Sequence, residues 1–167
     1  GSLTEKLLKV GVKIIAIEKD KKLVSYLKEK FASQDKKIKI IEADFLKLNL
    51  CFSIKNKNYK IVSNIPYNIT GKIIRKILEL EKKPKLAVLA VQKEVGESIV
   101  KKSNKENLLS LIIQTYGQAE IAGVIPAGAF WPLSKVQSAI LKINFYPEPK
   151  IKNPQKFIDF LKIGFSS

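Results

Sequence analysis

The residue types best suited to chemistry in this chain lie together in one run, Asn64-Ile65-Pro66-Tyr67. The side-chain oxygen of Asn64 can accept a hydrogen bond from the exocyclic amine of a nucleobase, and the backbone carbonyl of Ile65 can accept the second proton. Pro66 restricts its own backbone and that of the residue before it. Tyr67 can stack on the face of an extruded base. The run is therefore suited to holding an amine with its lone pair aimed at an electrophile.

A structural interpretation of the same run is also open. Asn or Thr directly before a helix commonly caps it, and the proline and tyrosine would then be packing residues. The apolar run Ile61-Val62 predicts a strand before the motif, and the apolar spacing over 73–78 predicts a helix after it. A polar loop between a strand and a helix is also where open α/β sheets place their sites.

The other elements follow from apolar runs and helical spacing. Strands are expected over residues 13–17, 38–41, 60–62, 86–91, 119–125 and 136–145. Helices are expected over residues 1–8, 23–31, 70–80, 93–101, 107–116 and 157–165. The strand–helix alternation through residue 92 predicts an α/β fold with a mostly parallel sheet and helices on both faces. The two late strands predict an antiparallel addition at one edge.

Two carboxylates follow the first two expected strands. Glu18 is placed to accept hydrogen bonds from ribose hydroxyls, as acidic residues in this position often do. Asp44 can accept from an adenine amine, and the backbone of Asp44 and Phe45 can flank that ring. Since the carboxyl ends of strands converge on one crevice, Glu18 and Asp44 are expected near Asn64. Each carboxylate could instead cap the helix that follows.

The composition favours a globular, basic protein. The chain has 167 residues, 46% of them hydrophobic, and 31 basic against 15 acidic residues give a net charge of +16. That balance favours a nucleic-acid partner over a membrane surface, although an AT-rich genome alone would also enrich lysine. Histidine is absent and Cys51 is the only cysteine, so we expect no metal, no disulfide and a cytoplasmic location. No apolar run suggests a membrane span.

With these residues in view, the chain resembles the ribosomal RNA adenine dimethyltransferases of the kasugamycin-resistance type over essentially its whole length. Residues 1–5 resemble the end of the family's glycine-rich cofactor loop, 16–18 its ribose-binding motif and 42–45 its adenine-binding motif. Residues 64–70 resemble its catalytic motif, which is the most specific match. Residues 91–95 fit this branch better than the erythromycin-resistance branch. Residues 126–138 resemble the aromatic-proline segment, in which Phe130 would be a second wall for the target base.

The resemblance implies a Rossmann-like domain that transfers methyl groups from S-adenosylmethionine to adenine amines of small-subunit ribosomal RNA. It implies catalytic roles for Asn64, Ile65, Pro66 and Tyr67, cofactor binding by Gly1, Glu18, Asp44, Phe45 and Asn64, and base stacking by Tyr67 and Phe130. The expected partner of this monomer is that RNA or the small-subunit precursor particle, with no metal and no membrane. The alternatives are a large-subunit methylase of the erythromycin-resistance type and a non-catalytic RNA-binding assembly factor.

The chain departs from the family pattern in two ways. It lacks most of the glycine-rich loop and the strand before it, which lies in the middle of the family's sheet. We therefore expect the strand at 13–17 to be separated from the strand at 60–62, and the chain by itself to be inactive. Ser134 replaces a second proline, which predicts a looser turn behind Phe130. Residues 1–146 are expected to form the catalytic core, incomplete at its amino-terminal end, and residues 147–167 to begin a helical domain.

Overall fold

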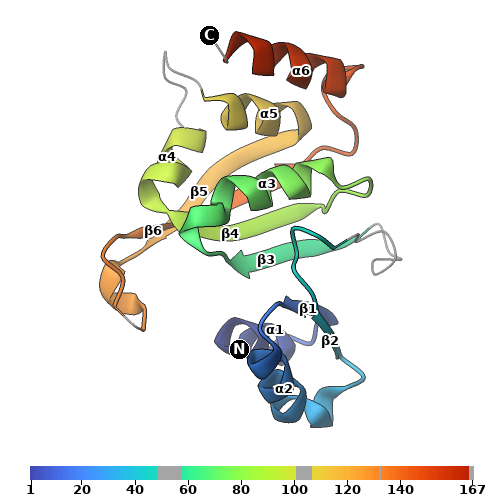
Figure 1. The fold of residues 1–167 in the computed structure, drawn as a ribbon, viewed down its shortest axis with the longest axis vertical. Coiled ribbons are helices and arrows are strands. Elements are labelled where there is room, and N and C mark those ends of the chain that lie inside the picture. Colours follow the sequence, from blue (N-terminus) through green and yellow to red (C-terminus); the bar gives the residue numbers. More distant parts are fainter. Residues whose placement is uncertain (49–57, 101–106, 132, 166–167) are drawn as a thin grey trace. The chain divides into compact units, whose positions relative to one another are not determined.

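The computed structural model describes residues 1–48, 58–100, 107–131 and 133–165, so Cys51 and most of the polar connection over 47–58 lie outside the described residues. The chain forms two compact units, Gly1–Leu50 and Cys51–Ser167, and each has its own sheet (Figure 1). None of the helices in the described residues is both long and apolar enough to cross a membrane.

The first unit is a two-stranded parallel sheet with helices packed on it. Its elements are α1 (Ser2–Lys9), β1 (Ile14–Glu18), α2 (Lys21–Lys30), a 3₁₀ turn (Ala32–Gln34) and β2 (Ile38–Glu42). The two strands run in register from the pair Ile14 and Ile38 to the pair Glu18 and Glu42. Their small core is built by buried side chains of both helices and the second strand, namely Leu8, Leu27, Phe31 and Ile38.

The second unit is a four-stranded mixed sheet in the order β3-β4-β6-β5. The strands are β3 (Lys60–Asn64), β4 (Leu86–Gln92), β5 (Gly117–Ile125) and β6 (Ser138–Phe145). The helices are α3 (Thr70–Glu79), α4 (Lys93–Val100), α5 (Leu108–Tyr116) and α6 (Pro154–Gly164). β3 and β4 are parallel, whereas β6 runs antiparallel to both β4 and β5. The expected α/β fold and the late antiparallel strands are thus confirmed, whereas the sheet of this unit is mixed rather than mostly parallel, since only β3 and β4 pair in parallel among its described strands.

The central strands of this sheet are covered by helices. α4 packs on β5 and β6, and α5 packs on β5 and on α3. Gly96 makes the approach of α4 possible, because a Cβ at that position would lie 2.8 Å from the Cβ of Ala139 on β6. α3 contributes five buried residues, Thr70, Ile73, Ile74, Ile77 and Leu78. The amino end of this helix, where the Asn64–Thr70 loop ends, is therefore held by a well-packed core.

The boundaries of two late elements differ from the expectation. β5 begins at Gly117 rather than residue 119, and β6 begins at Ser138 rather than residue 136. A residue without Cβ is needed at 117, since a Cβ there would collide with the backbone oxygen of Asn144. Val136 is instead held in a turn by hydrogen bonds to Ser134, so it precedes the strand.

The expected separation of the first and third strands is confirmed, because β1 and β3 belong to different sheets. α6 packs on α5 inside the second compact unit. The division of the chain at residues 146 and 147 stays a prediction.

Candidate active site

The loop from Asn64 to Thr70 connects the end of β3 to the start of α3. Asn64 is the last residue of β3 and pairs with Ala90 of β4. Pro66 has φ −59° and ψ 132°, and a 3₁₀ turn over Tyr67–Ile69 leads directly into α3. Asn64 and Pro66 are exposed, whereas Ile65 between them is 4% exposed. The buried side chain of Ile65 fixes the loop in the core and leaves the Asn64 side chain on the surface.

The capping interpretation of this loop is wrong. Neither the 3₁₀ turn nor α3 has a side-chain cap hydrogen bond, and the residues at the cap positions are Pro66 and Ile69. The Thr70 hydroxyl is buried and has no hydrogen-bond partner among the described residues. The polar side chains of the loop are therefore not used to begin the helix, and an exposed amide at Asn64 needs another explanation.

The hydroxyl of Tyr67 is hydrogen-bonded to a residue far away in the sequence. The Tyr67 hydroxyl and Ser138 Oγ lie 2.7 Å apart in a hydrogen bond that spans 71 positions of sequence. Ser138 is 0% exposed, whereas Tyr67 is half-buried. Because the far end of the ring is tied to a buried group, the direction of the long axis of the ring is restrained while part of the ring stays accessible.

The aromatic segment between β5 and β6 begins and ends beside this hydrogen bond. Its flanking residues, Ile125 and Ser138, are partners in the β5–β6 register. Ser138 is also the register partner of Gln92 at the end of β4. The last residue of the segment, Gln137, is joined to Lys93 by two hydrogen bonds, each of 3.0 Å. The ends of β3, β4 and β5 and the start of β6 thus lie at one edge of the sheet.

The turn behind Phe130 is hydrogen-bonded through Ser134, and the expectation that Ser134 loosens it relative to a proline stays a prediction. The Ser134 backbone N–H donates to the oxygen of Ala127 at 3.4 Å. Its hydroxyl donates to the Val136 oxygen at 2.8 Å and accepts from the Val136 N–H at 3.2 Å. A proline could make none of these three bonds. Phe130 is half-buried, and Pro132 lies outside the described residues.

In the first unit, Glu18 stands at the end of β1 and is not the cap of the next helix. Glu18 Oε1 accepts from the backbone N–H groups of Lys19 at 2.7 Å and Asp20 at 2.9 Å. The cap of α2 is Asp20, whose carboxylate accepts from Lys22 and Leu23. The capping interpretation is therefore wrong for Glu18, whose carboxylate orders the loop through one oxygen.

Asp44 lies at the same edge of the two-stranded sheet, because Glu18 pairs with Glu42 and the Ala43 N–H donates to the Glu18 oxygen at 2.9 Å. Asp44 Oδ1 accepts from Leu46 N–H at 3.0 Å, which orders the following turn. Asp44 Oδ2 pairs with Lys19 Nζ at 3.0 Å. This hydrogen bond from Lys19 is the main cause that lowers the pKa of Asp44. The Asp44 carboxylate therefore orders the turn that follows it and pairs with Lys19.

Gly1 and Phe45 complete the predicted residues of the first unit. Gly1 is the cap residue of α1, and a Cβ there would lie 3.2 Å from Leu27 Cδ2. Phe45 is half-buried beside Asp44. The structure thus brings Glu18, Asp44 and Phe45 together in one unit. It brings Asn64, Tyr67 and the segment of Phe130 together in the other unit.

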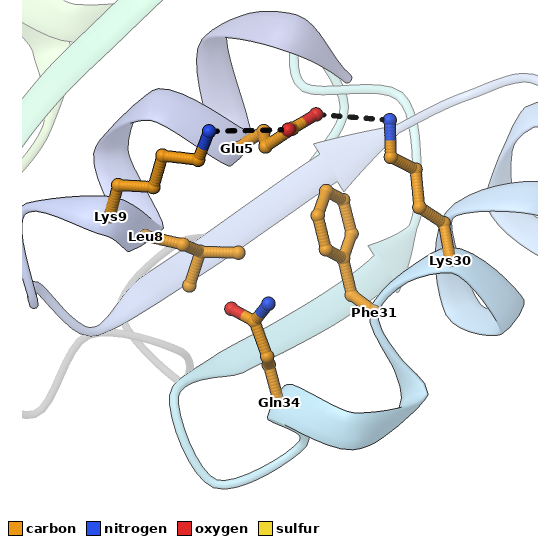
Figure 2. A pocket seen from close by; sticks show the side chains of 6 residues that line it. All are labelled: Glu5, Leu8, Lys9, Lys30, Phe31 and Gln34. Atoms are coloured by element: carbon orange, nitrogen blue, oxygen red, sulfur yellow. Dashed lines mark ion pairs between the residues drawn. The ribbon is translucent and has the colours of Figure 1, made fainter.

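A pocket in the first unit was not expected from the sequence (Figure 2). It is lined by Glu5, Leu8, Lys9, Lys30, Phe31 and Gln34. The Glu5 carboxylate lies 3.1 Å from Lys30 Nζ and 3.8 Å from Lys9 Nζ. The hydrogen bond with Lys30 lowers the pKa of Glu5 and raises that of Lys30. The charges are paired with one another, and none of the predicted site residues lines the pocket.

Sequence reasoning also missed the role of Ser138. The residue lies in the aromatic-proline segment, but a serine at the start of an apolar strand gives no local signal of a distant hydroxyl partner. Among the described residues, no group of three His, Cys, Asp or Glu side chains could hold a metal ion.

The fold and the loops at its strand ends define a Rossmann-like α/β protein. The chain belongs to the ribosomal RNA adenine dimethylase family, whose model matches residues 1–166. It is 40% identical over 165 residues to the ribosomal RNA small subunit methyltransferase A of Dehalococcoides mccartyi, covering 98% of this chain and 56% of that protein. It is 39% identical to the Fusobacterium nucleatum protein of that name, covering 100% of this chain and 64% of the relative. The chain therefore spans about half to two thirds of the length of these relatives.

Solved structures agree with this assignment. A dimethyladenosine transferase from Plasmodium falciparum superimposes with a TM-score of 0.84 at 26% identity, over 99% of this chain and 60% of that one. The 23S rRNA methyltransferase ErmE superimposes with a TM-score of 0.77 at 23% identity, over 92% of this chain and 62% of that one. The second likeness establishes the fold alone.

Proposed function

We propose that this protein transfers methyl groups from S-adenosylmethionine to the exocyclic amines of adenines in small-subunit ribosomal RNA, giving N6,N6-dimethyladenine. The observation that carries the proposal is the loop at Asn64. Its amide is exposed at a strand end and caps no helix, and the same loop carries Tyr67, whose ring axis is restrained by the hydrogen bond to Ser138. The two matched small-subunit methyltransferases favour the small subunit as the source of the RNA.

The carboxylates of the first unit suit the nucleoside part of such a cofactor. Glu18 uses Oε1 for the backbone of its own loop, so its other oxygen can accept from ribose hydroxyls. Asp44 shares its carboxylate with Leu46 N–H and with Lys19, whose side chain is 76% exposed. An adenine amine would have to share or replace the contact with Lys19. Phe45 and the backbone beside it would flank the adenine ring, and Gly1 would lie at the cofactor loop.

The cofactor supplies a methyl group on a positively charged sulfur, which is already a strong electrophile. Asn64 Oδ1 and the Ile65 carbonyl oxygen would accept the N–H groups of the adenine amine and so orient its lone pair. The same oxygens would stabilise the positive charge that this nitrogen gains during transfer. Tyr67 and Phe130 hold the base between them, and Pro66 keeps the loop rigid. The extra proton leaves to solvent.

The proposed partner is the RNA itself or the precursor of the small ribosomal subunit in the cytoplasm, bound by a protein monomer. The net charge of +16 supports binding to the phosphate backbone. No metal is needed, since the leaving group is activated by its own charge.

The test compares Asn64→Ala with the control Asn68→Ala. Asn68 also has an exposed amide side chain and lies in the same loop. Methyl incorporation into undermethylated small ribosomal subunits is measured together with cofactor binding by calorimetry, on this chain and on longer forms that contain it. Where the wild type transfers methyl groups, Asn64→Ala is expected to lose about 100-fold or more of the rate. Cofactor affinity should change little, and Asn68→Ala should keep its activity.

Three results would overturn the proposal. Near-wild-type turnover by Asn64→Ala would remove the amine-orienting role. Methylation of large-subunit RNA instead of small-subunit RNA would favour the erythromycin-resistance type of activity. RNA binding by every form without methyl incorporation or cofactor binding would favour a non-catalytic assembly factor.

A further inference from the structure

The segment between β5 and β6 carries the most exposed large aromatic side chain of the described residues. Trp131 is 94% exposed, and Leu133 in the same segment is 70% exposed. Figure 1 shows this segment extending beyond the end of the strands that carry it. Large apolar side chains held together on a projecting loop commonly mark a binding surface. In the same loop, Ser134 is hydrogen-bonded to Ala127 and Val136.

The charge around this loop suits a polyanion. The segment over 126–137 holds no acidic residue and one lysine, Lys135. Lys93, which is hydrogen-bonded to Gln137 at the base of the loop, adds a second positive charge. Lys142 of β6 does not add to this charge, because it is paired with Glu120 at 2.7 Å. An aromatic side chain beside lysines is the combination that binds single-stranded nucleic acid, because the bases stack and the phosphates pair with the cations.

The position of the loop places such a contact next to the proposed catalytic residues. The loop leaves the sheet at Ile125 and returns at Ser138, which are register partners. Ser138 is hydrogen-bonded to Tyr67, and Phe130 directly precedes Trp131. If a target adenine lies against Tyr67 and Phe130, as in the proposed function, Trp131 is one residue away from Phe130 in sequence, next to where a neighbouring nucleotide would lie.

We propose that Trp131 stacks on a base that flanks the target adenine, and that the described residues of this loop, 130, 131 and 133–137, are a contact surface for single-stranded RNA. This inference rests on the proposed function for its substrate, but not for its stacking chemistry. Trp131 contributes affinity and position, whereas Asn64 acts on the amine. Loss of Trp131 should therefore weaken RNA binding and raise KM for RNA, with a smaller effect on kcat.

The chain offers an internal probe, because Trp131 is its only tryptophan. Stacking should quench its fluorescence when a single-stranded adenine-rich oligoribonucleotide is titrated into the 167-residue protein. A duplex of the same length should quench less, since its bases are already stacked. Heparin, which has charge but no bases, should bind without quenching.

Affinity is then compared among variants by the anisotropy of a fluorescein-labelled oligoribonucleotide. Trp131→Ala should bind about 5- to 150-fold more weakly, which is the range for one stacked base. Its salt dependence should match that of the wild type, because the indole carries no charge. Phe160→Ala is the matched control: this aromatic side chain is 71% exposed on α6, and its loss should not change the affinity.

The outcomes separate this inference from the proposed function. Stacking quench with no methyl transfer by any form, the longer forms included, would support the loop as an RNA contact and refute the enzymatic proposal. Methyl transfer with an unchanged KM for RNA in Trp131→Ala would support the enzymatic proposal and refute the loop as an RNA contact. Equal quenching by single strand, duplex and heparin, or unchanged RNA affinity in Trp131→Ala, would overturn the inference and leave a protein partner as the occupant of the loop.

Discussion

The hydrogen bond between Tyr67 and Ser138 can be tested without any assumption about activity. Tyr67→Phe keeps the ring and removes the hydroxyl, which leaves Ser138 Oγ at 0% exposure with its 2.7 Å partner gone. An unsatisfied buried hydroxyl costs about 1–3 kcal/mol. Ser138→Ala removes the buried partner instead. Tyr67 is half-buried, so its hydroxyl can recover part of its hydrogen bonding from water, and the cost should be nearer to about 1 kcal/mol.

The double variant supplies the decisive number. With both hydroxyls removed, no polar group is left buried without a partner, so the combined cost should be smaller than the sum of the two single costs. We expect a coupling free energy of about 1 kcal/mol. As a control, Tyr67→Phe is combined with Ser98→Ala. The Ser98 hydroxyl donates to the Val95 oxygen within its own helix, so the two effects should add.

Hydrogen exchange of backbone amides in β3 and β6 is the suitable assay, because it reports the opening free energy of the second unit separately from that of the first. The two strands carry the two partners, Tyr67 following β3 and Ser138 beginning β6. Opening free energies that add to within about 0.3 kcal/mol in the double variant would refute the coupling. The restrained ring in the candidate active site would then have no support.

Two further predictions concern stability. Gly117→Ala should destabilise the second unit by about 1–3 kcal/mol, because its Cβ would collide with the backbone oxygen of Asn144. Gly128→Ala is the control and should be nearly neutral, since position 128 has open space around it. Thermal unfolding of the two variants measures the difference, and equal melting temperatures would contradict the close approach. The pKa of Asp44 is lower in the folded protein than its ordinary value of 3.8. Its ionised carboxylate therefore stabilises the fold at pH values above 3.8, and this contribution is lost as the pH falls through the lower pKa of the folded state. Urea unfolding from about pH 6 to about pH 2 should therefore show a smaller loss of stability in Asp44→Asn than in the wild type, and identical profiles would show that the contact with Lys19 has no effect.

The elements that the sequence predicts well are those whose burial follows a simple period. β4 is a strand with alternately buried residues in the middle of a sheet, and its continuous apolar run allows few other structures. α3 has a buried face of five residues, which the helical spacing of isoleucines predicts. Local apolar pattern was enough in these cases, because packing against the core decides the structure.

The details that were missed depend on partners far away in the sequence. Ser138 and Tyr67 are 71 positions apart, and neither residue carries a local sign of the other. β5 begins at Gly117 because this residue pairs with β6, and the absence of a Cβ allows it to lie close to Asn144. The hydrogen bonds of Ser134 to Ala127 and Val136 were missed for a related reason, because they depend on the folded turn.

Whether a polar side chain caps the next helix or turn distinguishes the predicted site residues from one another better than their positions in the sequence do. A polar side chain at the end of a strand has an ordinary explanation if it caps the next helix or turn. Glu18 does not cap α2, because Asp20 does, and α3 has no side-chain cap that Asn64 or Thr70 could supply. Glu18 and Asp44 nevertheless both order the backbone that follows them, Glu18 through the N–H groups of Lys19 and Asp20 and Asp44 through that of Leu46. Loss of either carboxylate should therefore affect local structure as well as cofactor binding, whereas loss of Asn64 should leave local structure unchanged.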